Sequence, residues 1–241
     1  MEQIKRNETS QEMVNLLTNY YDSVGIYPER DDPKRFCCPN VPSCPGNYAR
    51  GMQCHVGYKY GDALKVVVSS MDSGKGGADT IEKRTRHVYE KHDNPHMKGT
   101  LKAVSMLLDK DPEDSINYMA MINACKCCDL YSTNHMKIGY YRNCTTHKIN
   151  EYRILKPDVI LFQGQEYFSL AGCRQYLHEI EDAHVDPTIK KFLKKYSDGE
   201  IECYGVICIH PSARGRSFKK RKEFYDEIFP RIAQYIKEKL H

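Results

Sequence analysis

Four short apolar runs dominate the hydrophobic pattern of the chain, and none of them alternates cleanly with polar residues. They are rich in Val and Ile and span residues 64–70, 118–124, 158–164 and 203–209. A continuous apolar run of this length is typical of a parallel strand that is covered on both faces. The runs therefore predict the four central strands of an α/β domain.

Helix-like stretches separate these runs, at residues 99–108, 144–155, 167–176 and 187–195. Two further helices are predicted, at about 9–21 and at about 218–240, where apolar residues recur at helical spacing. Alternating strands and helices favour right-handed crossovers. We therefore expect one domain over residues 1–241, a three-layer α/β/α sandwich around a central, mainly parallel four-stranded sheet. A loop rich in cysteine and proline, at about 28–60, follows the first helix.

Polar residues follow three of the predicted strands at their carboxyl ends. Asp72 comes after the first strand, Asn123 ends the second, and His210 follows the fourth. Carboxyl ends of parallel strands meet at one edge of a sheet, where ligands bind. Any one of these residues alone is more simply a cap or turn residue. All three at three strand ends predict a shared pocket.

The position of the charged residues along the chain is more informative than the net charge. Lys and Arg total 36 against 32 Asp and Glu, for a net charge of +4. Residues 214–222 nevertheless hold six basic residues and no acidic one. Such a cluster is usually a solvated surface, but beside a rigid loop it can bind phosphates.

The sequence holds 11 cysteines, and it contains neither an apolar run long enough to span a membrane nor an apolar signal sequence near Met1. We therefore expect a cytoplasmic protein that does not bind membranes. In a reducing compartment, clustered cysteines more often hold a metal or an iron–sulfur cluster than form disulfides. Cys173, Cys203 and Cys208 lie in helix-like or strand-like contexts and are expected to be buried thiols.

Four motifs, in this order, resemble the iron–sulfur-containing branch of the uracil-DNA glycosylase superfamily. They are VVVSSMDSG, INACKC, CTTHKINEYRILKPDVILFQG and HPSARG. The resemblance implies a DNA glycosylase that hydrolyses the N-glycosidic bond of uracil or a related damaged base in base excision repair. It also implies that the base is flipped out of the DNA before the bond is broken.

The resemblance assigns a role to individual residues. Asp72 would orient water and stabilise the positive charge on the sugar, and His210 would stabilise the leaving base. Asn123 would read the edge of the base, and His96 would stack on its ring. The further residues expected to contact the base are Ser70, Met71 and Ser212. Those expected to contact DNA are Arg214, Arg216, Lys219, Lys220 and Arg221.

The first motif departs from the family pattern. The classical enzymes have Gly-Gln-Asp-Pro-Tyr and the iron–sulfur branch has Gly-Glu-Ala-Pro-Gly, whereas this chain has Ser-Met-Asp-Ser-Gly at residues 70–74. Ser73 replaces the proline, and Gly74 replaces the tyrosine that excludes the methyl group of thymine. The choice between uracil and thymine is therefore open, and a second hypothesis is a non-catalytic nucleic-acid-binding protein of the same fold. A generic metal-binding α/β protein is a weaker alternative, because it leaves the basic segment unexplained.

The resemblance also implies a 4Fe-4S cluster on four cysteines. Cys127, Cys144 and Cys44 match the family ligands best, and the fourth is Cys38 or Cys37, with Cys54 a more distant alternative. Cys125 and Cys128 have no assigned role. Zinc on the same thiolates is the rival cofactor, since four cysteines suit either metal. The expected partner is DNA, and a monomer is favoured.

Overall fold

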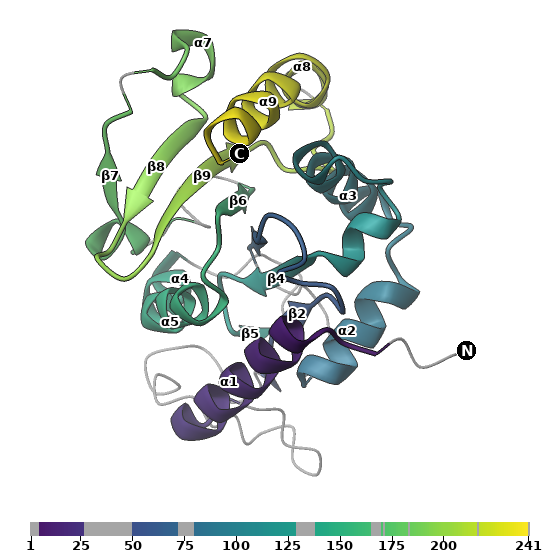
Figure 1. Cartoon of the computed structure of the whole chain (residues 1–241), viewed down its shortest axis with the longest axis vertical. Helices are drawn as coiled ribbons and strands as arrows, with labels where there is room; N and C mark the ends of the chain where they lie inside the picture. Colours follow the sequence, from purple (N-terminus) through teal and green to yellow (C-terminus); the bar gives the residue numbers. More distant parts are fainter. Residues whose placement is uncertain are drawn as a thin grey trace.

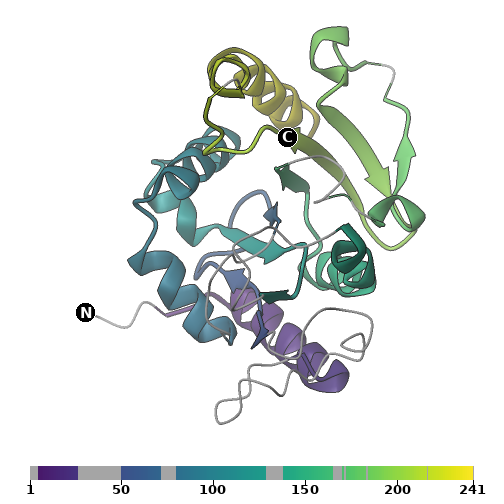
Figure 2. The same cartoon turned by 180° about the vertical axis from the view of Figure 1, so that it is seen from behind.

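The computed structural model describes residues 5–26, 50–71, 80–128, 138–164, 170, 172–182, 184–215 and 217–240. Within these ranges the chain is mixed α/β, with helices packed around a seven-stranded sheet (Figure 1). Figure 1 shows α1 (Glu8–Val24) in the lower part of the molecule and α7 (Pro187–Lys190) at the top, and Figure 2 shows the same arrangement from behind.

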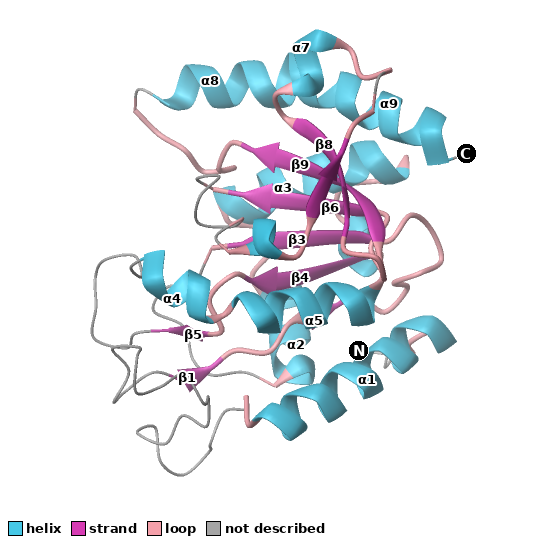
Figure 3. Ribbon diagram, turned by 90° about the vertical axis from the view of Figure 1, so that its left-hand side faces the viewer, coloured by secondary structure: helices cyan, strands magenta, loops and turns pink. Residues whose placement is uncertain are grey.

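The centre of the sheet consists of the four predicted strands. They are β3 (Val66–Ser70), β4 (Met119–Asn123), β6 (Val159–Gln163) and β9 (Glu202–Cys208). These strands are parallel and lie in the order β4-β3-β6-β9 (Figure 3). The prediction of four parallel strands at these places is confirmed.

The predicted total of four strands is wrong, because antiparallel strands extend the sheet at both edges. The added strands are β2 (His55–Val56) beside β4, β8 (Leu193–Ser197) beside β9, and β7 (His178–Ile180) beside β8. A separate pair joins β1 (Arg50–Gly51) to β5 (Cys127–Cys128). The helix predicted over 187–195 is limited to α7 (Pro187–Lys190). Charged residues are common on edge strands such as β7. In β7 and in the neighbouring β8 they interrupt the apolar pattern by which a strand is recognised.

The other predicted helices are present with shifted ends, except the one predicted over 167–176. The described helices are α1 (Glu8–Val24), α2 (Ile81–Glu90), α3 (Pro95–Leu108), α4 (Ile138–Asn143), α5 (Thr145–Leu155), α8 (Ser217–Glu223) and α9 (Phe229–Leu240). A π-helical segment, Phe224–Ile228, joins α8 to α9. In the described part of 167–176, only Cys173–Gln175 forms a short 3-10 turn. The prediction missed α2 and α4.

The helix α3 shows how local chemistry sets an end. Asn94 precedes the helix, and its side-chain oxygen accepts a hydrogen bond of 3.0 Å from the backbone N–H of Met97. Pro95 occupies the first turn, where a missing N–H costs nothing. None of the helices in the described ranges is long and apolar enough to cross a membrane.

Alternate residues of the central strands enter two hydrophobic clusters. Val66 and Val68 of β3 pack in one cluster with side chains from α3 and α9. Val67 of β3 packs in the other cluster with side chains from α1 and α5. All three valines are fully buried, which explains why the strand reads as a continuous apolar run.

A buried ion pair connects the end of the sheet to the first helix. Lys126 pairs with Glu151 of α5, and both side chains are almost fully buried, at 1% and 0% exposed. The hydroxyl of Tyr21 on α1 donates a hydrogen bond to the same carboxylate. A buried charge is tolerated only when it is paired and hydrogen-bonded, so these three groups depend on one another.

Replacing Glu151 with Ala should therefore be strongly destabilising. It leaves the ammonium of Lys126 buried without its partner, which typically costs about 3–5 kcal/mol. The free energy of unfolding, measured by urea titration, provides the test. Glu200→Ala is the matched control, because the Arg153–Glu200 pair is exposed at the glutamate and such pairs contribute about 1 kcal/mol or less. Equal losses in the two variants would contradict the role given to the buried pair.

Candidate functional site

The ends of β3 and β4 place two of the predicted site residues side by side. Ser70 and Asn123 are paired in the parallel register of the two strands. The ladder continues past the strands, because Ala124 donates its backbone N–H to the carbonyl of Ser70 at 2.7 Å, and Cys125 donates to that of Met71 at 3.0 Å. The two loops that follow the strands therefore start from fixed positions.

His210 lies in a tight turn after β9. The backbone N–H of Ser212 donates to Nδ1 of His210 at 3.2 Å, and the hydroxyl of Ser212 lies 3.0 Å from the same nitrogen. A second bond closes the turn, from the N–H of Ala213 to the carbonyl of His210 at 2.9 Å. Because Nδ1 accepts a backbone hydrogen bond, the neutral ring carries its proton on Nε2. His210 is thus prepared to donate a hydrogen bond from Nε2.

Helix α3 brings His96 to the same place. The rings of His96 and His210 are tilted by 38°, with their centroids 4.9 Å apart. Gly99 permits this approach, since a Cβ there would lie 2.7 Å from Cβ of Pro211. Gly164, with a positive φ of 102°, similarly leaves room for Met71 and lies near His210. The structure thus brings together five predicted residues: Ser70, Met71, His96, Asn123 and His210.

A cavity of about 230 Å³ opens between these strand ends and helices α2 and α3. Its lining residues are Ser70, Arg84, His87, Val88, Lys91, Asn94, His96, Met97, Met121 and Asn123. Ligand pockets of drug size measure about 300–1,000 Å³, so this cavity suits a single small ring.

Three polar atoms of the cavity lack partners. They are Oγ of Ser70, Oδ1 of Asn123 and Nδ1 of His96, all buried and without a hydrogen bond to any described residue. The side chains of Ser70 and Asn123 belong to residues only 6% and 4% exposed. Buried polar atoms are nearly always hydrogen-bonded, and an unpaired one is costly. Their concentration in one cavity indicates a site for a polar ligand.

His96 is uncharged at neutral pH. Burial lowers its pKa from 6.5 to about 4, and the charges of His210 and Arg84 add to the effect. A neutral ring beside the cavity can stack on a planar ligand without bringing a charge of its own.

The basic segment lies on the turn and helix that follow His210. Arg214, Lys219 and Lys220 are exposed there. Arg221 differs, because it donates a hydrogen bond of 3.1 Å from Nη1 to the carbonyl of Pro211, and its guanidinium lies 4.7 Å from the ring centre of Phe218. Arg221 therefore holds the turn that carries His210, in addition to adding positive charge.

Three cysteines gather next to the site. The Sγ atoms of Cys125 and Cys127 are 3.6 Å apart, and the N–H of Lys126 donates to Sγ of Cys144 at 3.3 Å. Hydrogen bonding between the thiols of Cys125 and Cys144 contributes to a raised pKa at Cys144. All three thiols are buried. Cys127 and Cys144 are predicted ligands, whereas no role was predicted for Cys125, which stands two residues before Cys127.

Thiolates are ligands that suit a thiophilic metal. In the described part of the chain, however, no group of three or more His, Cys, Asp or Glu side chains is placed to hold a metal ion. Cys54, the alternative ligand, lies instead beside Tyr21 and Glu151, where burial raises its pKa to about 12. The three cysteines expected to be isolated thiols, Cys173, Cys203 and Cys208, are indeed buried.

Several predicted site residues lie outside the described residues. They are Asp72, Arg216, Cys37, Cys38 and Cys44. Their roles remain predictions.

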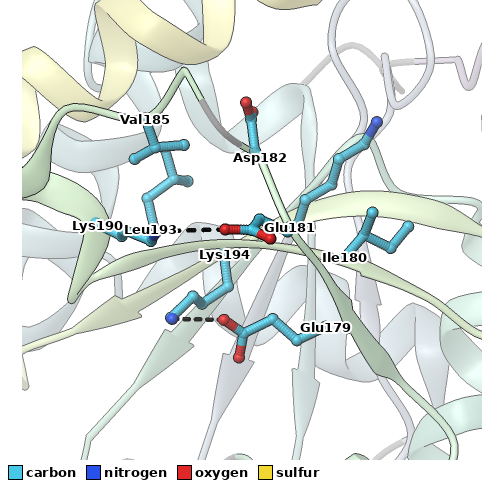
Figure 4. A pocket seen from close by; sticks show the side chains of 9 residues that line it. Glu179, Ile180, Glu181, Asp182, Val185, Lys190, Leu193 and Lys194 are labelled. Atoms are coloured by element: carbon cyan, nitrogen blue, oxygen red, sulfur yellow. Dashed lines mark hydrogen bonds and ion pairs between the residues drawn. The ribbon is translucent and has the colours of Figure 1, made fainter.

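A second cavity, of about 280 Å³, lies at the edge of the sheet around β7 and β8 (Figure 4). Its charged groups neutralise one another, since Lys194 pairs with Glu179 and Lys190 lies 4.0 Å from Glu181. In contrast to the first cavity, no unpartnered buried polar atom has been found among its described residues. We therefore take the cavity at the strand ends as the functional site.

The chain matches no protein-family model, and no curated protein matches it significantly. The geometry of the site is therefore the basis for inferring its function.

Lowering the pH should reduce the free energy of unfolding, because His96 is harder to protonate in the folded protein than in the unfolded chain. Its pKa is about 4 in the folded protein against 6.5 when unperturbed, so the unfolded chain binds the proton more tightly. The stability that the neutral ring confers is present above about pH 6.5 and is lost as the pH falls to about 4. His96→Phe keeps an aromatic ring and should flatten this part of the profile. Urea unfolding at several pH values would measure it.

His178→Phe, at an exposed position of β7, is the control and should leave the profile unchanged. Parallel profiles for wild type and His96→Phe would show that the pKa of His96 is not lowered.

Proposed function

We propose that the protein is a DNA glycosylase that takes a flipped-out uracil, or a related damaged base, into the cavity at the strand ends. The observation that carries this proposal is the concentration of unpartnered polar atoms from Ser70, His96 and Asn123 in one small cavity, with His210 beside it. A nucleobase is a planar ring with polar edges, which is the kind of ligand that such a cavity suits.

Asn123 reads the edge of the base in this proposal. Its amide offers an acceptor and a donor side by side, which complement a ring N–H and the neighbouring carbonyl of uracil. The buried and unpartnered Oδ1 supports the acceptor role. His96 is neutral, lies at the cavity and stacks on the ring. Ser70, Met71 and Ser212 are the further residues that contact the base.

His210 assists departure of the base. When the glycosidic bond breaks, its electron pair stays on the base, the water oxygen adds to the sugar carbon, and a proton from water ends on the base. A donor aimed at a base carbonyl stabilises the negative charge as it develops. The hydrogen bond from Ser212 to Nδ1 supports this role, because it leaves the proton of the neutral ring on Nε2.

Asp72 orients the attacking water in this proposal. It follows Met71, at the end of the strand that carries Ser70. A carboxylate there would also stabilise the positive charge on the sugar. A three-layer α/β/α arrangement belongs to the same proposal and is supported by the two hydrophobic clusters of the sheet.

Duplex DNA binds at the basic segment. Arg214, Arg216, Lys219 and Lys220 contact phosphates, and Arg221 also fixes the turn of His210. Phosphate contacts supply affinity and position, and they carry no sequence information themselves. The exposure of Arg214, Lys219 and Lys220 next to the turn of His210 supports this placement.

The cysteines hold a 4Fe-4S cluster or, as the rival cofactor, zinc. Cys127 and Cys144 are the proposed ligands from the described residues, with Cys38 or Cys37 and Cys44 as the others. Cys125 lies close enough to replace one of them. Such a cofactor would clamp the cysteine- and proline-rich loop to the domain.

A second candidate function is nucleic-acid binding without catalysis. Ser73 stands where the family has a proline, and Gly74 stands where the classical enzymes have a tyrosine. This departure in the first motif favours the alternative. An intact protein that binds DNA with a flipped-out base but cleaves no damaged base would establish it.

His210→Ala should lose most glycosylase activity. Removing one well-placed donor to a developing negative charge costs roughly 10²–10³ in rate. Single-turnover cleavage of a uracil-containing oligonucleotide, followed by alkali, would measure the loss. His178→Ala, at an exposed strand position, is the matched control. Full activity of His210→Ala would remove His210 from the mechanism.

Asn123→Asp should change the choice of base, since it replaces the amide donor with an acceptor and should reduce selection of uracil over cytosine.

The protein purified without oxygen should contain iron and absorb broadly in the visible range. Cys127→Ser should lower the iron content per folded protein, whereas Cys208→Ser, a buried thiol elsewhere in the core, should not. Metal analysis and absorption spectra provide the measurement. Colourless protein with stoichiometric zinc would establish the rival cofactor.

A further inference from the structure

Helix α8 carries an aromatic side chain that the proposed mechanism does not use. Phe218 is 50% exposed, the highest exposed fraction among the large apolar side chains in the described ranges. No residue of α8 is buried, and Figure 3 shows the helix on the side of the molecule to which the arrowheads of β6 and β9 point. A single exposed ring is common on protein surfaces, so its surroundings decide whether it can bind a ligand.

The surroundings of Phe218 are cationic. Arg221 and Lys222 follow it by three and four residues and therefore share its face of the helix. The guanidinium of Arg221 lies 4.7 Å from the centre of the ring. Lys219, Lys220 and Lys222 form no ion pair with any described residue. Single-stranded nucleic acid binds to this combination, because cations hold the phosphates while an aromatic ring stacks on a base.

The helix is fixed to the turn of His210 by hydrogen bonds on both sides of that residue. Nη1 of Arg221 donates to the carbonyl of Pro211 at 3.1 Å, and the hydroxyl of Tyr225 donates to the carbonyl of Ile209 at 2.7 Å. Tyr225 belongs to the π-helical segment, an irregularity that is frequent at functional sites. The exposed ring therefore has a defined position relative to the turn. A ring on a fixed helix loses little freedom when a base stacks on it, which favours binding.

We propose that Phe218 is a further DNA-binding residue, on which an unpaired base stacks while the neighbouring cations hold the phosphates of its strand. The inference rests on the proposed function and adds the form of the DNA. A single strand, or a duplex opened beside the flipped base, is bound in preference to a fully paired duplex, because neighbouring bases cover the faces of paired ones. Every base has a flat face, so the stacking is independent of sequence.

The test measures binding of a fluorescent, undamaged oligodeoxynucleotide of about 12 nucleotides to the intact protein by anisotropy, as a single strand and as a duplex. The single strand should bind more tightly, although the duplex has the higher charge density. Phe218→Leu should weaken binding of the single strand by about fivefold or more, whereas Phe218→Tyr, which keeps the ring, should retain it. A strand of the same length without bases should bind wild-type protein more weakly than the normal strand, because it cannot stack.

Tyr176→Leu is the matched control. Tyr176 is 36% exposed and lies at the end of a different element, so its replacement should leave the affinity unchanged. Lys220→Gln separates phosphate contacts from stacking, since it should weaken binding of both forms of DNA and lower the salt dependence by about one unit of slope. Phe218→Leu should leave that slope unchanged. Unfolding curves of each variant show whether the fold is kept.

Equal or tighter binding of the duplex by the wild type would overturn the inference, as would a single-strand affinity that folded Phe218→Leu retains or that Tyr176→Leu loses. Binding of the base-free strand as tightly as the normal strand would also overturn it. Phe218-dependent binding to vesicles of anionic phospholipid, without binding to either form of DNA, would overturn it in favour of a membrane surface.

Because the oligonucleotide is undamaged, its binding needs no catalysis, and the two proposals fail separately. Excision of uracil without a Phe218-dependent preference would leave the glycosylase and remove the stacking residue. The preference without any excision would do the reverse.

Discussion

The parallel register of β3 against β4 is the constraint on which the rest of the site depends. It sets Ser70 opposite Asn123, and the two hydrogen bonds that continue beyond the strands fix the start of both following loops. Backbone hydrogen bonds of a buried ladder cannot shift by one residue without turning every side chain to the other face. The polar atoms at the strand ends are therefore held in place by the hydrophobic core rather than by one another.

The remaining walls of the cavity come from helices that pack against this edge. Gly99 lets α3 approach the turn of His210, which brings His96 within ring contact of His210. Helix α2 supplies a basic face on the other side. The result is a small space between a neutral histidine and a cationic wall, with three buried polar atoms that have no partner among the described residues. A planar ring with polar edges is the ligand proposed to satisfy these groups.

The buried pair of Lys126 and Glu151 links this edge of the sheet to α1. Lys126 stands between Cys125 and Cys127 in the chain, while its ammonium reaches the carboxylate that Tyr21 also contacts. Its backbone N–H donates to Sγ of Cys144. The cysteine cluster, α5 and α1 thus share one network of buried polar groups. Such a network is stable only when all its members are present, so the geometry of the cysteines and the position of the first helix are coupled.

The sequence alone determined the central sheet and the approximate position of the candidate site. Four apolar runs without alternation identified β3, β4, β6 and β9, because strands buried on both faces must be apolar throughout. Their carboxyl ends pointed to Asp72, Asn123 and His210, because parallel strands end at the same edge. Asn123 and His210 lie at that edge, and Asp72 lies outside the described residues.

Only the tertiary structure decided the features that depend on which elements pack together. The short strands β7 and β8 carry charged residues between their apolar ones, so nothing in their pattern separates them from a helix or a loop. The face of α2 that holds Arg84 resembles any solvated helix face until it lies against the ends of β3 and β4. Cys144 precedes α5, and it lies beside Cys125 and Cys127 only because α5 packs against β4. Burial and proximity are properties of packing, and packing brings together residues that are far apart in the chain.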